Sequence, residues 1–181
     1  MKKSSYISLS YISLAATLLL LAGGVAWLQK RSGTKTGTTV MGDKKLPRGY
    51  RNNNPLNIRI NPANNWQGKV AIENNTDGVF EQFVAMQYGY RAALKLIQNY
   101  INNNGLNTVA QIIAKWAPNN ENNTAGYIQR VIGINQWTPA KVIDPQNVSD
   151  MADLVYAMAI VENGNTILPD YKQIWSGWAM L

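Results

Sequence analysis

The chain has 181 residues, with 17 lysines and arginines, 10 aspartates and glutamates, and neither cysteine nor histidine. The missing residue types exclude thiol nucleophiles, histidine bases, disulfides and nearly all zinc sites, so catalysis would have to use carboxylates, tyrosine, lysine or hydroxyl groups, and no cofactor is implied. Residues 1–48 hold eight basic side chains and one acidic one, whereas residues 49–181 hold nine of each, so a nucleic-acid partner is not expected.

Residues 7–28 form an uncharged stretch centred on four consecutive leucines. As a helix rising about 1.5 Å per residue it would span the roughly 30 Å core of a bilayer. A cleavable signal peptide is the alternative, since Lys2 and Lys3 precede the stretch, but its apolar core would exceed the usual length of about 15 residues. We therefore expect a basic terminus at 1–6, one transmembrane helix in the lipid bilayer, and a flexible Gly/Thr-rich tether at 29–47.

The run RGYRNNNPLNIR at 48–59 shows neither helical nor strand periodicity. Pro55 fixes its own φ and favours extended geometry at Asn54, and asparagine tolerates left-handed conformations, so the run predicts an ordered loop. The amides of Asn53, Asn54 and Asn57, if they converge on a cleft, suit a ligand rich in hydroxyl and N-acetyl groups. A surface turn is the structural alternative.

Short strands are predicted after this loop, followed by helices. Three β-type runs, at 57–60, 68–72 and 79–84, are separated by turn clusters rich in asparagine and glycine. Beyond them, apolar residues recur at intervals of three and four. The predicted helices cover residues 90–101, 109–116, 124–132, 151–162 and 170–178. The pattern indicates an α+β, mostly α domain over residues 48–181, with a small antiparallel β-sheet.

Several helix ends carry capping signals. Gly105 follows three asparagines and predicts a C-cap, while Thr108 predicts the N-cap of the next helix. Thr124 is expected to begin a third helix, and Ser149 or Asp150 to cap the fourth.

Glu162 is the candidate general acid. At 100° per residue it lies on the same helix face as Met151 and Met158, which places it on the apolar stripe. It also ends its helix, because Asn163 and Gly164 follow as a C-cap. Burial and the negative end of the helix dipole both raise the pKa of a carboxyl group, as an acid for glycosidic cleavage requires. A glutamate that extends to water or pairs with an arginine is the structural alternative.

Further carboxylates and aromatic side chains complete the candidate site. Asp77, Glu81 and Glu121 are candidates for a second catalytic carboxylate, since hydrolysis uses a pair roughly 5–10 Å apart. For Asp77 we favour capping of a turn, and for Glu121 capping of a helix. Tyr88, Trp116 and Tyr127 could stack on sugar rings, although aromatic residues in a small domain belong more often to the core.

These motifs resemble those of cell-wall enzymes. Glu162-Asn163-Gly164 is similar to the Glu-Ser-Gly helix end of lytic transglycosylases and related lysozyme-fold enzymes. Residues 48–178 resemble small bacteriophage muralytic proteins that begin with an Arg-Asn-Asn-Asn-Pro-Gly-Asn-Ile-Arg run, with Leu56 here in place of the glycine. The resemblance implies a lysozyme-like domain in which Glu162 protonates the bond between N-acetylmuramic acid and N-acetylglucosamine. Because Glu162 follows the asparagine run here, we expect a circularly permuted arrangement in which the two meet at one cleft.

We therefore expect a membrane-anchored, phage-encoded enzyme that degrades peptidoglycan from a virion membrane or the host inner membrane. Peptidoglycan is the expected partner, with virion membrane or capsid proteins as further candidates, and no metal is implied. Endopeptidase activity is less compatible with a chain that lacks histidine and cysteine. The alternatives are a non-catalytic murein-binding or structural virion membrane protein, and a small lysis protein that acts through residues 1–47.

Overall fold

The computed structural model describes residues 46–120 and 123–181, which belong to one compact unit, Thr39–Leu181. The expected membrane segment at 7–28 lies outside the described residues, as does Glu121. Within the described ranges, no helix combines the length and the apolar character needed to cross a bilayer.

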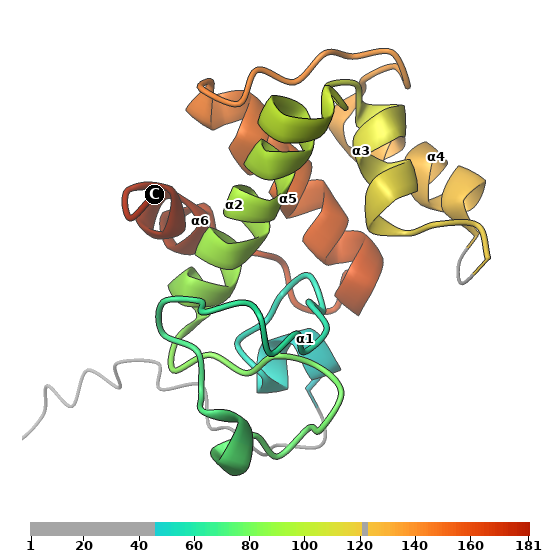
Figure 1. Cartoon of the computed structure of the whole chain (residues 1–181). Helices are drawn as coiled ribbons and strands as arrows, with labels where there is room; N and C mark the ends of the chain where they lie inside the picture. Colours follow the sequence, from blue (N-terminus) through green and yellow to red (C-terminus); the bar gives the residue numbers. More distant parts are fainter. Residues whose placement is uncertain (1–45, 121–122) are drawn as a thin grey trace, which may run out of the picture. The chain divides into compact units, whose positions relative to one another are not determined.

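This part of the chain is mostly helical (Figure 1). The α-helices are α1 Arg48–Arg51, α2 Met86–Asn104, α3 Val109–Trp116, α4 Thr124–Asn135, α5 Val148–Asn163 and α6 Tyr171–Trp178, with a short 3-10 helix, η1, at Ile72–Asn74. All five predicted helices occur, whereas α1 and η1 are too short to have shown a periodic pattern.

The prediction of a small antiparallel sheet is wrong, because the described residues form only isolated β-bridges there. Arg59 pairs with Phe80, and Lys69 with Phe83. Side chains satisfy backbone groups that a longer ladder would have used: the Asn75 amide donates to the carbonyl oxygen of Phe80 at 2.9 Å and accepts from two backbone N–H groups of its own turn. Such local bonds compete with strand pairing.

The core forms where α2 packs against α6 and α5 packs against α4 (Figure 1). Its fully buried side chains include Tyr90, Leu94 and Ile97 of α2, Met151, Leu154 and Met158 of α5, and Ile174 of α6. Gly177 permits the close approach of α6 to α2, since a Cβ atom there would lie 2.8 Å from the carbonyl oxygen of Gln87. These contacts fix α2 and α5, which supply side chains to the site described below.

Capping explains the helix boundaries. Gly105 ends α2 with φ 65° and Thr108 caps the start of α3, as the sequence predicted. Thr108 also forms a reciprocal capping box with Gln111, which the sequence analysis did not predict. The N-cap of α5 is Asn147, whose side chain accepts two backbone bonds, so the expected cap at Ser149 or Asp150 is wrong. The N-cap of α4 is Asn123, and Thr124, which was expected to begin this helix, is its first residue.

Candidate active site

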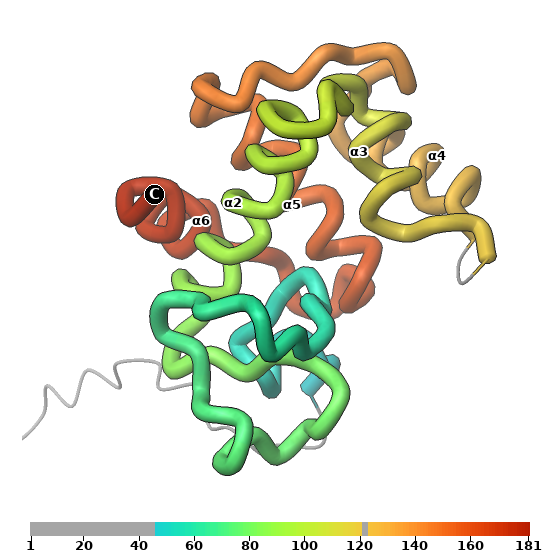
Figure 2. Tube along the Cα trace, viewed as in Figure 1, coloured from blue at the N-terminus to red at the C-terminus, as the bar shows by residue number. Residues whose placement is uncertain are grey.

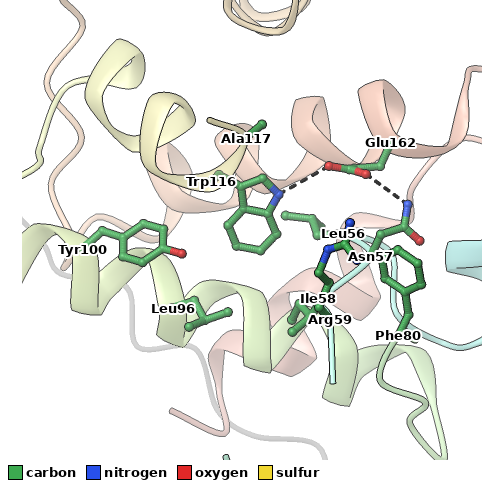
Figure 3. Close-up of a pocket in the computed structure, with 10 residues that line it drawn as sticks. All are labelled: Leu56, Asn57, Ile58, Arg59, Phe80, Leu96, Tyr100, Trp116, Ala117 and Glu162. Carbon is green, nitrogen blue, oxygen red and sulfur yellow. Dashed lines mark hydrogen bonds between the residues drawn. The ribbon is translucent and has the colours of Figure 1, made fainter. Parts of the chain in front are cut away.

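Glu162 lies in the last turn of α5, and its carboxyl group accepts three hydrogen bonds. Oε1 accepts from the Tyr127 hydroxyl at 3.0 Å and from the Trp116 indole Nε1 at 3.3 Å. Oε2 accepts from the Asn57 amide Nδ2 at 3.0 Å. Figure 3 shows Trp116 and Asn57 reaching the carboxyl group from opposite sides. All three donors are neutral groups, so they orient the carboxyl group without adding a positive charge beside it.

Burial raises the pKa of Glu162 above its usual value of 4.5. The hydrogen bonds from Asn57, Tyr127 and Trp116 act in the opposite direction, because they favour the anion, but they do not cancel the effect of burial. The Tyr127 hydroxyl is itself buried, and burial together with the adjacent Glu162 charge raises its pKa well above the usual 10.0. Tyr127 therefore stays protonated and remains a donor.

Glu162 opens onto a cavity of about 360 Å³. The cavity is lined by residues of the loop after α1, by Phe80 and by residues of α2, α3 and α5 (Figure 3). The polar members are Asn57, Arg59 and Glu162; the others are Leu56, Ile58, Phe80, Leu96, Tyr100, Trp116 and Ala117. Among the described residues, Glu162 is the one carboxylate in this lining, and its mostly apolar neighbours account for its desolvation.

The two carboxyl oxygens of Glu162 have different remaining capacity. Oε1 already accepts two hydrogen bonds, whereas Oε2 accepts one. A proton carried by Glu162 is therefore best accommodated on Oε2, which can still donate it to a ligand. The arrangement can act as a general acid, and the three donors can stabilise the anion left after proton transfer.

Asn57 is placed by the loop that precedes it. The Asn54 side chain bonds both backbone groups of Ile58 and donates to the carbonyl oxygen of Glu81, each at 2.9 Å. The backbone N–H of Asn57 donates to the Asn54 carbonyl oxygen at 3.0 Å, and Asn57 adopts φ 50°. Asparagine tolerates this left-handed conformation better than most residues. The asparagine run thus forms an ordered loop, as expected, and directs one amide at Glu162.

Asn163 ties this loop to the end of α5. Its Nδ2 donates to the Pro55 carbonyl oxygen at 2.7 Å, and its Oδ1 accepts from the backbone N–H of Gly49 at 3.1 Å. Figure 2 shows the chain around residues 49–58 beside the C-terminal end of α5. The expected meeting of the asparagine run and the Glu162 helix end is therefore present. Sequence reasoning treated Asn163 only as part of a helix cap, so it missed this connection.

Two predicted ligand-binding amides are structural. Asn53 and Asn54 are buried, and the Asn53 amide donates to the carbonyl oxygen of Phe83 at 2.9 Å. Neither residue lines the cavity. The structure thus places these two amides away from the cavity, where they satisfy buried backbone groups.

The predicted aromatic residues divide in a similar way. Trp116 lines the cavity, whereas Tyr88 does not; Tyr88 packs against Gly68, where an added Cβ atom would come within 2.3 Å of its ring. Tyr127 is buried and contacts Glu162 through its hydroxyl group, so it holds the carboxyl group instead of presenting a ring face. Leu96 and Tyr100 line the cavity and were missed, although their spacing of four residues placed them on one face of α2.

Asp77 caps a turn, which is the role that the sequence analysis favoured over a catalytic one. It accepts from the Asn52 amide at 2.8 Å and from the backbone N–H of Phe80 at 3.1 Å, and Arg48 lies 3.7 Å away. Burial acts to raise its pKa, but these hydrogen bonds and the Arg48 charge lower it overall. Asp77 does not line the cavity. No group of three or more metal-ligating side chains occurs in the described part of the chain.

Comparison with known proteins points to bacteriophages. No family model matches the chain. Over 84 residues it is 40% identical to Protein P5 of Pseudoalteromonas phage PM2, an alignment that covers 46% of this chain and 52% of that protein. The chain is similar to a phage protein. It spans about half the length of this curated relative, whose name states no activity.

Proposed function

We propose that this protein cleaves the glycan strand of peptidoglycan, with Glu162 as the general acid. The observation that carries the proposal is the state of the Glu162 carboxyl group: burial raises its pKa, three neutral donors orient it, and it opens onto a cavity. A carboxyl group with a raised pKa keeps its proton to higher pH than an exposed one, which favours protonation of a glycosidic oxygen.

In the proposed reaction, the proton on Glu162 Oε2 passes to the glycosidic oxygen while the bond from that oxygen to the anomeric carbon breaks. The leaving sugar keeps the proton as a hydroxyl group, and Glu162 becomes a carboxylate. The donors Asn57, Trp116 and Tyr127 stabilise this anion. Glu162 then accepts a proton from the 6-hydroxyl group of the muramic residue, as that oxygen bonds to the anomeric carbon, or from an attacking water molecule.

The first of these outcomes, a lytic transglycosylase reaction, is favoured by the cavity lining. Hydrolysis by the usual pair of carboxyl groups needs a second carboxylate roughly 5–10 Å away. Among the described residues no second carboxylate lines the cavity, and Asp77 is held in its own turn. Intramolecular attack by a substrate hydroxyl group needs only one protein acid. Glu121 lies outside the described residues and stays a candidate for the second group.

The cavity also offers surfaces for sugar rings. Tyr100 and Trp116 pack edge to face with their centroids 6.5 Å apart, which fixes the orientation of the indole. Phe80 lies on the other side of the cavity from them (Figure 3). Aromatic rings of this kind bind the apolar faces of sugars while side-chain amides bind their polar groups.

We further infer a lysozyme-like, circularly permuted domain, anchored in a virion membrane or the host inner membrane through residues 7–28. The similarity to a phage protein supports a phage origin, and the uncharged stretch supports the anchor. The meeting of the asparagine run with the Glu162 helix end supports the permuted arrangement. The tether would let the domain reach the cell wall.

The full-length chain in detergent, wild type beside Glu162→Gln, tests the proposal on isolated peptidoglycan with mass spectrometry of the soluble products. Anhydromuropeptides from the wild type alone are the expected result. Reducing muropeptides would keep Glu162 as the acid but make the enzyme a hydrolase. Equal release by both proteins would move the acid elsewhere, and binding without products would indicate a murein-binding protein.

A further inference from the structure

A second hollow, of about 410 Å³, lies against α2 outside the cavity of Glu162. One wall is the loop over residues 63–67, which includes Trp66 and the amides of Asn64 and Gln67. The other wall is α2, which contributes Arg91 and Lys95. The two hollows share no lining residue.

The charge of this second hollow is one-sided. Arg91 and Lys95 are four residues apart on α2, a spacing that places two like charges on one helix face, where they repel each other. They are the only charged residues of α2, and no acidic residue lines the hollow. Lys95 is exposed and makes no ion pair with any described residue. An anionic ligand would offset this repulsion.

The guanidinium group of Arg91 is held in place for polar recognition. The Arg91 Nε donates to the Met180 carbonyl oxygen at 2.9 Å, which fixes the guanidinium group while its terminal nitrogens remain donors. The Trp66 side chain also lines the hollow, while its indole Nε1 is buried and has no hydrogen-bond partner within the described residues. A planar guanidinium group and an ammonium group together suit carboxylates.

The position on α2 relates this hollow to the Glu162 cavity. Leu96 and Tyr100, which line that cavity, lie one and five residues after Lys95 on the same helix. Five residues of α-helix rise about 7.5 Å. An extended peptide of four residues spans about 14 Å. Such a peptide is therefore longer than the axial separation of the two sets of lining residues. At 100° per residue Leu96 and Tyr100 also lie about 100–140° around α2 from Lys95, so the peptide would have to pass round the helix as well as along it.

We propose that this hollow binds the carboxylates of the peptidoglycan stem peptide, through Arg91 and Lys95. The inference rests on the proposed function for its choice of ligand. It adds a peptide subsite to a glycan-cleaving protein, so the protein would prefer strands whose muramic residues carry peptides over bare glycan.

Binding is tested without cleavage, on full-length protein labelled with ¹⁵N at tryptophan. The probes are the tetrapeptide L-alanyl-γ-D-glutamyl-L-lysyl-D-alanine, the same peptide with both carboxylates amidated, and vesicles containing phosphatidylglycerol. We expect a saturable shift of the Trp66 indole resonance, assigned through Trp66→Phe, with the acidic peptide. Lys95→Met should weaken this binding about fivefold, as expected for one exposed charge contact. The matched control Lys172→Met, an exposed cation on α6, should leave it unchanged.

No saturable shift, or equal binding of the amidated peptide, would overturn the proposal. A shift caused by the vesicles and not by the peptide would also overturn it and assign the hollow to a lipid surface. A cleavage assay separates this result from the proposed function: Lys95→Met should raise KM for peptide-bearing strands and leave kcat and the reaction on peptide-free strands unchanged. Peptide binding by a protein that cuts neither strand would refute glycan cleavage and keep the site.

Discussion

The C-terminal end of α5 and the loop over residues 75–82 both hold buried or half-buried carboxyl groups, but their partners differ in charge. Glu162 is bonded by an amide, an indole and a phenol, and burial raises its pKa. Asp77 lies beside Arg48, and Glu81 forms a 3.0 Å ion pair with Lys69. Neutral donors lower the pKa of both Glu162 and Asp77, so burial decides the difference: it outweighs the donors at Glu162, whereas at Asp77 the hydrogen bonds and the Arg48 charge outweigh it.

Replacement of Glu162 should have the largest effect, because it removes the carboxyl group on which the comparison depends. Glu162→Gln keeps the shape of the side chain but removes the transferable proton, so glycan cleavage should fall by about 10³-fold, within the range for loss of a general acid. Release of soluble muropeptides measures the effect. Glu73→Gln is the matched control, because it makes the same chemical change at an exposed position in η1. A comparable loss in both variants would count against a special role for Glu162.

The next largest effect should come from Asn54, which ties the asparagine loop to the 75–82 loop. Asn54→Ala removes three hydrogen bonds of a fully buried side chain. The free energy of unfolding should fall by about 3 kcal/mol, at roughly 1 kcal/mol per bond. Chemical denaturation measures this, with the exposed Asn103→Ala of α2 as the control. If Asn54→Ala is as stable as the control, the amide is not structural.

Asn57 sharpens the comparison because its bond to Glu162 acts against burial. Asn57→Gly keeps the left-handed backbone accessible but removes the amide donor. The pKa of Glu162 should rise further, so the alkaline limb of the kcat profile should move to higher pH. Rates near the optimum should fall about tenfold as the anion loses a stabilising bond. A profile that keeps its position would show that Asn57 does not act on the acid.

The smallest effect is expected at Asp77, and it should depend on pH. Its lowered pKa means that the folded state favours the anion, so its stabilisation is present above the unfolded-state pKa and is lost as pH falls through the lower folded-state value. Asp77→Asn should therefore reduce the free energy of unfolding by about 1 kcal/mol at neutral pH. In acid the wild type and the variant should converge. A constant difference across this pH range would contradict the assignment.

The sequence was sufficient for features that local patterns determine. The spacing of apolar residues located α2 to α6, and Gly105 and Thr108 marked the end of α2 and the start of α3. The same spacing placed Glu162 on the apolar stripe at the end of α5. The sheet was overestimated, since Asn75 and its neighbours bond the backbone locally. These local bonds compete with cross-strand pairing, and composition alone does not show which of the two prevails.

The asparagines show why the site was only partly predictable. Asn53, Asn54 and Asn57 have the same side chain and lie within five residues, yet two are buried and one faces Glu162. Long-range partners decide this, because Asn53 bonds Phe83 and Asn54 bonds Glu81. Tyr127 was a candidate for stacking on sugar rings, because its hydrogen bond to Glu162 could not be seen in the sequence. That bond depends on how α4 packs against α5.

The central claim is that the pKa of the Glu162 carboxyl group, at the end of α5, is higher than that of an ordinary glutamate. Titration of the full-length protein labelled with ¹³C at glutamate side chains tests it directly, with the Glu162 resonance identified among the four glutamates by its loss in Glu162→Gln. We predict an inflection for Glu162 above the usual pKa of 4.5. An inflection at or below that value would mean that the three donors outweigh burial, and Glu162 would then lack the raised pKa on which its assignment as the acid rests.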